Sequence, residues 1–255
     1  MKTFLKSLPL IGPTLTHGYH WWKDDTASKL RRILRGRQDL FVVQIGSNDG
    51  ITGDPIHPLL RTNPSWKALL VESVPYLFER LRKNYSNTPH IEFANVAITE
   101  QAGMATFYYV DPVAQDYVPG LSCLFEQLRS FDHGHITQHL GGALERFVVS
   151  TQISTFPLST ILERKNITRI NLLHIDAEGH DWIVLRQLDL KRFQPDVILW
   201  EHIHLSQDDK TKALAFLSRD YRITNLGFVF LGVNKVLQRS TFEVISEGKL
   251  IEIPL

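Results

Sequence analysis

The sequence predicts an α/β fold, in which a mostly parallel sheet carries helices on both faces. Three observations lead to this class. Short apolar runs alternate along the chain with segments of helical spacing, which is the pattern of repeated strand and helix units. These runs are continuously apolar, as is typical of strands buried on both faces. Several of them end at a glycine or an acidic residue, and ligands bind at that edge of such sheets.

The first half of the sheet comes from three apolar runs. They predict strands at 40–45, 66–71 and 91–98. A helix is expected at 75–85, where Leu77 and Leu81 lie one helical turn apart. Pro75 suits the first turn of this helix, because its ring fixes a helical φ and it needs no amide partner there. An aromatic-rich run at 105–110 predicts a further β segment.

The second half repeats the pattern. It predicts extended segments at 148–153, 170–175, 195–200, 221–231 and 233–237. It predicts helices at 157–164, from 176 to 188, and at 208–217. The last two extended segments are expected to pair across a turn at 232–235.

The chain is expected to be one domain with two additions, because it contains no repeat, low-complexity segment or linker. The domain covers 40–255. Residues 1–39 are expected to form a helical arm or a cover over the active site. The segment 111–146 breaks the strand and helix pattern with Pro and Gly pairs, so it is predicted to be an insertion that carries substrate contacts.

Composition limits the partners and the compartment. The 255 residues are 43% hydrophobic and 22% charged, which fits a folded domain and excludes disorder. Lysine and arginine number 28 against 27 acidic residues, so no basic field exists and no nucleic-acid partner is expected. No apolar run approaches the roughly 18 residues of a membrane span. The single cysteine, Cys123, favours a reducing, cytoplasmic location.

A glycine turn follows the first predicted strand in the run QIGSNDG. Gly46 and Gly50 allow a ligand to approach the backbone closely. The turn lacks both G-x-G-x-x-G and a P-loop lysine, which disfavours dinucleotides and nucleoside triphosphates. Glu72 ends the next strand and could accept bonds from both hydroxyls of a ribose, or it could simply cap the turn before Pro75. Together the two features favour a ribosyl ligand without a pyrophosphate.

Five segments together resemble the FkbM family of S-adenosylmethionine-dependent methyltransferases. They are QIGSNDG, VESVPYLFERL, FANVAIT, GMATFYY and LLHIDAEGHDWIVLRQL, and the resemblance covers about residues 40 to 230. It implies a class I methyltransferase (Rossmann-like) fold, with a seven-stranded sheet whose last strand is antiparallel. It also implies that S-adenosylmethionine is the cofactor.

The resemblance also implies roles for individual residues. Those that would wrap the methionine portion of the donor are Gly46, Ser47, Asn48, Asp49 and Gly50. Glu72 would hold the ribose, with Ser73 beside it. Asn95 and Val96 would lie near the adenine, and Asp176 and Glu178 would lie by the sulfonium and the acceptor. One departure is Gln44, an amide where many methyltransferases have an acidic residue, which weakens the case for a carboxylate contact there.

Methyl transfer to a hydroxyl requires alignment of donor and acceptor and a group that accepts a proton. The predicted catalytic residues are Asp176, Glu178, Glu201 and His202. Asp176 is the first choice for a polar role in the site, and Glu201 or His202 would orient the acceptor or act as general base. His180 and Asp181 are expected to face solvent or to complement the dipole of the helix that they begin.

The same strand ends offer metal ligands, but no metal site is expected. In an extended Glu-His-Ile-His run, Glu201 points to one side while His202 and His204 point to the other, so they cannot readily share an ion. Three further histidines occur in HGHITQH, namely His133, His135 and His139. Since no cysteine accompanies them, an exposed loop is favoured over a zinc site.

The leading functional hypothesis is O-methylation of a hydroxyl on a small molecule, such as a sugar, a glycolipid or a secondary metabolite. The preference for oxygen over nitrogen comes from the family resemblance, and N-methylation stays an alternative. A module that binds the donor without transferring a methyl group is a second alternative. A nicotinamide-dependent oxidoreductase is a third, disfavoured by the glycine turn. The acceptor's identity and the oligomeric state are left open.

Overall fold

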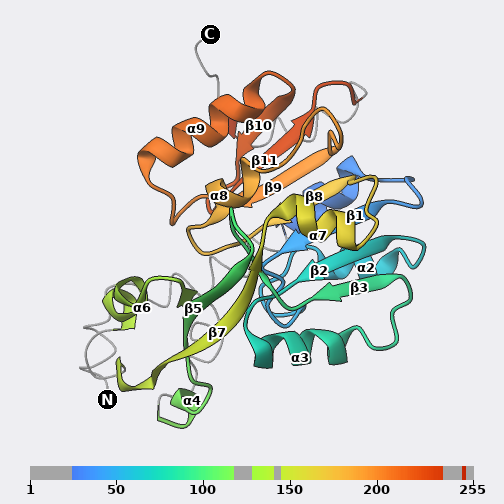
Figure 1. Cartoon of the computed structure of the whole chain (residues 1–255). Coiled ribbons are helices and arrows are strands. Elements are labelled where there is room, and N and C mark those ends of the chain that lie inside the picture. The colour runs from blue at the N-terminus through green and yellow to red at the C-terminus, as the bar shows by residue number, and fades with distance from the viewer. Residues whose placement is uncertain (1–24, 118–127, 141–144, 238–248, 251–255) are drawn as a thin grey trace.

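The computed structural model describes residues 25–117, 128–140, 145–237 and 249–250. Its main sheet has the strand order β12-β10-β11-β9-β8-β1-β2-β3 (Figure 1). These strands are β1 (Phe41–Ile45), β2 (Lys67–Val71), β3 (Ile91–Ala94), β8 (Leu172–Ile175), β9 (Val197–Glu201), β10 (Tyr221–Asn225), β11 (Val229–Asn234) and β12 (Lys249–Leu250).

Strand direction confirms the predicted sheet. β1 pairs in parallel with both β2 and β8, and the parallel pairing extends to β3 on one side and β9 on the other. β11 inserts between β9 and β10 and is antiparallel to both, so the seventh strand is reversed as expected. The short β12, antiparallel to β10, is an addition to the seven predicted strands.

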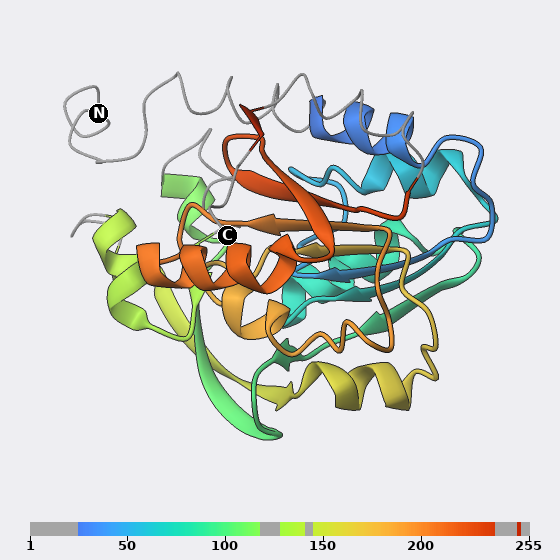
Figure 2. The same cartoon turned by 90° about the horizontal axis from the view of Figure 1, so that it is seen from above.

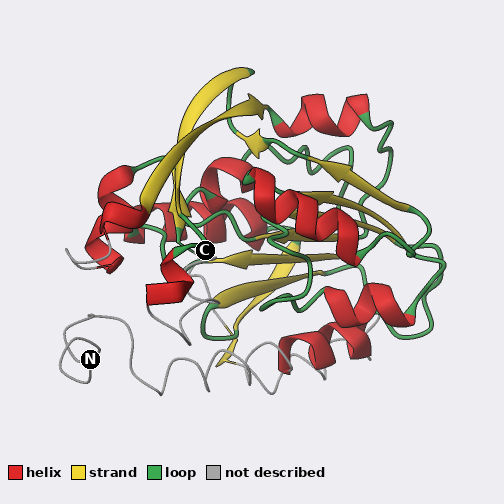
Figure 3. Cartoon of the chain, turned by 90° about the horizontal axis from the view of Figure 1, so that it is seen from below, coloured by secondary structure: helices red, strands yellow, loops and turns green. Residues whose placement is uncertain are grey.

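Helices cover both faces of the main sheet (Figures 2 and 3). On one face lie α7 (Leu158–Arg164), α8 (Asp181–Leu185) and α9 (Gln207–Ser218). On the other lie α2 (His57–Thr62), the last turn of α3 (Pro75–Asn84) and a helix over residues 25–33. Leu30 in this last helix and Leu34 directly after it are buried against the sheet. The described part of the expected 1–39 arm therefore packs on a sheet face, while residues 1–24 lie outside the described residues.

A second sheet stands beside the main one, with the order β4-β7-β5-β6. Its strands are β4 (Ala97–Ile98), β5 (Gly103–Val110), β6 (Arg129–Ser130) and β7 (Val148–Phe156). β5 and β7 run together away from the main sheet and carry α4 (Ala114–Tyr117) and α6 (His133–Leu140) at their far end (Figure 1). The predicted insertion, 111–146, lies between these two long strands.

Three local expectations differ from the structure. The single strand expected at 91–98 is divided between the two sheets, because the chain leaves the main sheet at residues 95–96. The turn expected at 232–235 is wrong: the chain turns at 226–228, where Gly227 has φ +97° and its amide donates to Asn225 Oδ1 (2.8 Å). The short helix α2 was not predicted, since six residues carry too little periodicity.

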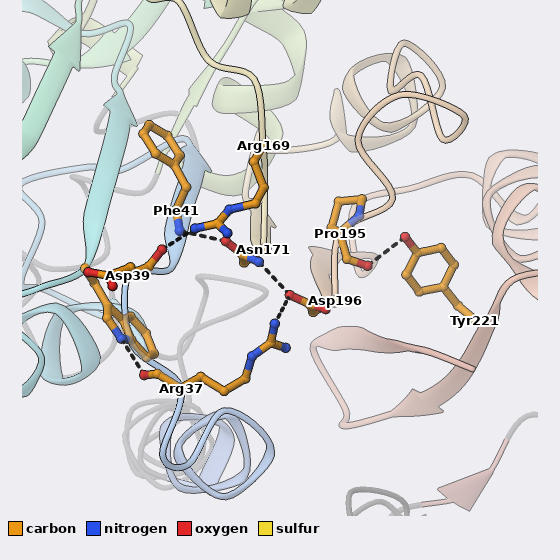
Figure 4. Close-up of polar contacts among 9 residues, drawn as sticks. Arg37, Asp39, Phe41, Arg169, Asn171, Pro195, Asp196 and Tyr221 are labelled. Carbon is orange, nitrogen blue, oxygen red and sulfur yellow. Dashed lines mark hydrogen bonds and ion pairs between the residues drawn. The ribbon is translucent and has the colours of Figure 1, made fainter. Parts of the chain in front are cut away.

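Polar contacts fix the amino edge of the main sheet (Figure 4). Asn171 Oδ1 accepts from the Phe41 amide (2.9 Å), and Asn171 Nδ2 donates to Asp196 (2.7 Å). Arg37 pairs with the same Asp196 oxygen (2.9 Å). These contacts hold the starts of β1, β8 and β9 in register, so the carboxyl ends of the three strands are aligned as well. Among the described residues, no helix combines the length and apolar character required to cross a bilayer.

Candidate functional site

A pocket opens at the carboxyl edge of the main sheet, where the second sheet meets it. Residues predicted from the sequence that line it are Gly46, Ser73, Val96, Asp176 and Glu178. The lining also includes Phe107, Arg129, Phe131 and His180. The main sheet supplies the strand ends, and the second sheet closes the opposite side. The pocket is therefore a joint product of both sheets.

The glycine turn brings β1 into direct contact with the end of β8. Gly46 has φ +81°, and a side-chain carbon at this position would lie 1.8 Å from the carbonyl oxygen of Asp176. No other residue fits there, because both the conformation and the space exclude a Cβ atom. Gly50 is similarly confined by Leu81 and Tyr85, with φ +75°. The turn is a rigid element that determines how close a ligand comes to the ends of both strands.

Side chains inside the turn bond mainly to the turn itself. Asp49 Oδ1 accepts from the amides of Ile51 (2.8 Å) and Thr52 (2.7 Å), while its Oδ2 accepts from the Thr52 hydroxyl (2.9 Å). Asn48 Oδ1 accepts from the Asp49 amide (2.7 Å), and the Ser47 hydroxyl donates to Gln44 O (3.4 Å). The backbone amides of the five residues expected to wrap the donor all donate within the protein as well, so their carbonyl oxygens are the backbone groups left to contact a ligand.

Glu72 joins the glycine turn to the end of β2. Its Oε2 accepts from the Asn48 amide and its Oε1 accepts from the Val74 amide, both at 2.8 Å. The side chain is buried, and it is not among the described residues that line the pocket. Glu72 therefore does cap the turn before Pro75, which was one of the two roles considered for it from the sequence. Each carboxylate oxygen can accept one more bond, so a ribose contact is compatible with this cap.

The residues expected near the adenine also support this corner. Asn95 donates from Nδ2 to the carbonyl oxygens of Glu72 (2.7 Å) and Ser73 (3.1 Å). Val96 packs against the main core and lines the pocket. Gln44, the departure from the family pattern, is buried and donates to Asp54 Oδ1 (3.1 Å). Its amide therefore serves the loop after the glycine turn.

Asp176 and Glu178 follow β8 in a loop that Asp181 holds in place. Asp181 Oδ1 accepts from the Ala177 amide (3.2 Å) and its Oδ2 accepts from the Gly179 amide (3.1 Å). Asp181 is buried in the first turn of α8, so the alternative in which it faces solvent is wrong and the one in which it complements the helix dipole fits its position. The Asp176 Oδ1 atom is buried and has no hydrogen-bond partner. Two carboxylates thus reach the pocket while a third supports their loop.

Crowding changes the acidity of this group. Burial raises the pKa of Asp176, although Arg129 lowers it. Burial and then Asp176 raise the pKa of Glu178 and of Glu201 well above the usual value. The pKa of Asp181 is raised to about 7 by burial and by Asp176. Buried like charges oppose one another, so this corner of the protein favours any cation that enters it.

The end of β9 adds Glu201 and, beyond it, His204. The chain turns after Glu201, and residues 202–205 are not extended. His204 Nε2 consequently lies 3.9 Å from Glu201 Oε2 and 3.6 Å from Glu178 Oε2. The expectation that Glu201 and His204 point to opposite sides is wrong, because it assumed an extended backbone. Glu201 Oε2 is buried and makes no hydrogen bond.

His202 has a different environment. Its ring stacks on Phe230, with centroids 3.9 Å apart, and its Nε2 contacts Asn225 Oδ1 at 3.3 Å. Burial lowers its pKa. These contacts attach His202 to β10 and β11, and neither His202 nor Glu201 is among the described residues that line the pocket, although Glu201 lies beside it through its contact with His204. The catalytic role predicted for His202 therefore has no support from its contacts.

Several residues of the pocket were not assigned to it from the sequence, among them Arg129, Phe131 and His180. Arg129, on β6, is buried. Burial opposes its charge, but Glu72, Glu178 and Asp176 together raise its pKa. Phe131 and His180 meet across the pocket, with ring centroids 4.7 Å apart. Arg129 and Phe131 lie within the predicted insertion, which was the available signal, but no local pattern singled them out.

The other histidine cluster lies elsewhere. His133 begins α6 and its ring meets Tyr108 edge-on, at 5.2 Å between centroids. The side chains of His135 and His139 lie outside the described part of the chain.

Comparison with known proteins identifies this architecture. The Methyltransferase FkbM domain family matches residues 44–230, which is well over half of the chain. The chain belongs to this family. The predicted fold is confirmed as a class I, Rossmann-like methyltransferase, and the cofactor is S-adenosylmethionine. No curated protein matches the chain.

Solved structures with a similar fold are methyltransferases of low sequence identity. The precorrin-6y C5,15-methyltransferase of Geobacter metallireducens is 12% identical, with a TM-score of 0.43 over 83% of this chain and 88% of that one. A putative O-methyltransferase from Klebsiella pneumoniae is 11% identical, with a TM-score of 0.43 over 91% and 94%. Aeropyrum pernix fibrillarin, solved with S-adenosyl-L-methionine, is 10% identical, with a TM-score of 0.40 over 83% and 76%.

Proposed function

We propose that this FkbM methyltransferase transfers the methyl group of S-adenosylmethionine to a hydroxyl oxygen of a small-molecule acceptor. The observation that carries the proposal is the pair of carboxylates, Asp176 and Glu178, that face the same pocket as the glycine turn. A sulfonium donor is a cation, and buried carboxylates attract a cation strongly.

The donor half of the proposal rests on the first two strand ends. Carbonyl oxygens of the 46–50 backbone would hold the methionine portion, and Glu72 would accept a bond from a ribose hydroxyl while keeping its two amide bonds. Ser73 and Val96, which line the pocket, would border the nucleoside, with Asn95 supporting them. This arrangement needs no pyrophosphate group, in agreement with the absence of a phosphate-binding glycine motif.

The acceptor half rests on the ends of β8 and β9. A hydroxyl must lose its proton as its oxygen attacks the methyl carbon, so a proton acceptor has to lie beside it. We assign that role to Asp176, whose Oδ1 atom is buried and without a hydrogen-bond partner. Glu178 and Glu201 would orient the acceptor. The second sheet would close over it with Arg129 and Phe131 and exclude water.

A binding experiment tests the site directly. S-adenosylmethionine carries a sulfonium charge that its product, S-adenosylhomocysteine, lacks. Isothermal titration calorimetry should give tighter binding of the charged donor than of the product, and the difference should shrink in Asp176→Asn. Equal affinity for both molecules in the wild-type protein would reject the placement of the sulfonium beside Asp176.

A transfer experiment tests the reaction. Labelled donor is incubated with hydroxylated sugars, glycolipids and secondary metabolites, each paired with an analogue in which an amine replaces the hydroxyl. We expect label in the hydroxyl compounds. Label confined to amines would indicate N-methylation, and donor binding without label in any acceptor would indicate a binding module. A cytoplasmic location and a role in secondary metabolism belong to the same proposal.

A further inference from the structure

We propose that Glu178, Glu201 and His204 bind one divalent transition-metal ion beside the methyl-transfer pocket. The three residues come from two neighbouring strand ends, and their ligand atoms all lie within 4.8 Å of one another. Glu178 follows β8, Glu201 is the last residue of β9, and His204 is in the turn after it. The reversal of the chain after β9 is what brings the third ligand to the other two.

The distances fit a shared ion better than direct bonds between the side chains. His204 Nε2 is 3.6 Å from Glu178 Oε2 and 3.9 Å from Glu201 Oε2, and both values exceed a hydrogen-bond length. Ligand atoms that lie about 2.0–2.2 Å from one ion are roughly 3 to 4 Å from each other. Both distances from His204 therefore already have the spacing of a coordination shell, and the third pair, between Glu178 and Glu201, lies within 4.8 Å.

A second observation points to a ligand at this place. Glu201 Oε2, the oxygen that faces His204, is buried and has no hydrogen-bond partner. The side chain of Glu201 is 14% exposed and that of Glu178 is 11% exposed, so little water reaches either carboxylate. An ionised carboxylate withdrawn from water requires a compensating positive charge.

The charged groups around Glu201 do not supply enough positive charge to compensate its buried carboxylate. Asp176 and Asp181 add two further acidic groups close to Glu201. Arg129 is the cation that acts on the same carboxylate. Arg129 also interacts with Glu72, on the donor side of the pocket. A divalent ion would balance Glu178 and Glu201 and leave Arg129 to the donor side.

The donor set suggests the class of ion. Two carboxylates with one imidazole suit first-row transition ions such as Mn²⁺, whereas Mg²⁺ and Ca²⁺ prefer oxygen ligands throughout. Three protein ligands leave coordination positions open. In the proposed function, on which this step rests, the acceptor hydroxyl would occupy one of them. Coordination would lower the pKa of the hydroxyl and fix its oxygen toward the methyl carbon.

The reaction at such a site balances without a further reagent. The hydroxyl proton passes to Asp176, and an oxygen–carbon bond forms as the carbon–sulfur bond breaks. The electron pair of the broken bond remains on sulfur, so the sulfonium becomes a neutral thioether. The ion keeps its oxidation state throughout.

The test is Mn²⁺ binding by the full chain after treatment with a chelator. Calorimetry, together with loss of the electron paramagnetic resonance signal of free Mn²⁺, should give one ion per chain. Glu201→Gln and His204→Gln should each weaken binding by at least about tenfold, since each removes a ligand. Glu100→Gln and His133→Gln change exposed residues outside the cluster and should leave the affinity unchanged. No binding by the wild-type chain, or equal binding by all variants, would overturn the proposal.

Two additional measurements keep the result interpretable. Nitrogen coupling in the resonance spectrum of bound Mn²⁺ would report His204 in the wild-type protein, without dependence on a variant that folds poorly. The absence of that coupling would overturn the assignment of His204. Titration of S-adenosylhomocysteine into the same samples separates the two proposals. Product binding without Mn²⁺ binding rejects the metal site alone, and Mn²⁺ binding without product binding rejects the donor site alone.

Discussion

The two ends of the pocket use similar side chains in opposite ways. On the donor side, the buried carboxylate of Glu72 accepts two backbone amide bonds at 2.8 Å. On the acceptor side, Asp176 and Glu201 each have a buried oxygen without a hydrogen-bond partner. The donor side is thus completed by the chain's own backbone, whereas the acceptor side lacks sufficient positive charge. The comparison indicates that folding builds one half of the site and that a ligand completes the other.

Gly46→Val should break the donor side most severely. The new side chain would begin 1.8 Å from the carbonyl oxygen of Asp176, so one of the two strand ends must move. We expect loss of detectable S-adenosylhomocysteine binding and destabilisation by about 3 kcal/mol or more, measured by calorimetry and by denaturant unfolding. Gly36→Ala is the matched control, because Gly36 also has positive φ but has open space around it. That control should cost about 1 kcal/mol and leave product binding intact. Product binding by the valine variant would show that the donor does not approach this turn.

Asp176→Asn should impair the acceptor side of the pocket and leave the donor side intact. It removes the proposed proton acceptor while keeping the shape of the side chain, so methyl transfer should fall by roughly 10²- to 10⁴-fold. Binding of the uncharged product, S-adenosylhomocysteine, should change little. Asp208→Asn, which changes an exposed residue of α9 that pairs with Lys212, serves as the control and should keep its transfer rate. Equal rates in wild type and Asp176→Asn would assign proton removal to another group.

Glu72→Gln tests whether the donor side depends on its two amide bonds. A glutamine offers one oxygen, so its NH₂ group would face the amide of either Asn48 or Val74. The loss should reduce stability by about 1–3 kcal/mol and weaken donor binding. Glu92→Gln, at an exposed position on β3, is the control for removing a glutamate charge. If both variants have the same stability and donor affinity, the bridge between the two strand ends is not important.

Substitution of His174 should have the smallest effect on stability. The pKa of this residue is shifted by burial alone, whereas the pKa values of the pocket carboxylates also depend on neighbouring charges. Burial alone lowers its pKa to about 3, so it is neutral in the folded chain while the unfolded chain gains a proton below about pH 6.5. Its contribution to stability is therefore present above that pH and lost as the pH falls. His174→Leu should gain about 1 kcal/mol relative to wild type between pH 7.0 and 5.5, from denaturant unfolding at both values. A difference that is the same at both pH values would contradict the neutral, buried imidazole.

The main sheet was predictable because its signals are local. Continuous apolar runs marked the strands at 41–45, 67–71, 172–175 and 197–201 to within two residues. Parallel strands buried on both faces need such runs, whatever surrounds them. The second sheet was harder to predict from the sequence. Its strands β5 and β7 are partly exposed, and their residue pattern does not indicate which sheet they join. The turn between β10 and β11 was misplaced because two glycines were available and only one has positive φ.

The sequence by itself determined which apolar segments form the strands, where the glycine turn lies and which acidic residues end the strands. These features together identified the family. Only the tertiary structure decided that Arg129 enters the pocket from the second sheet and that His204 turns back toward Glu178 and Glu201. The physical reason is distance along the chain. Periodicity and turn chemistry act over a few residues, whereas Glu178 is 26 positions from His204 and 49 positions from Arg129. Pairing of β8 with β9 brings the first two together, and the second sheet brings Arg129 to them.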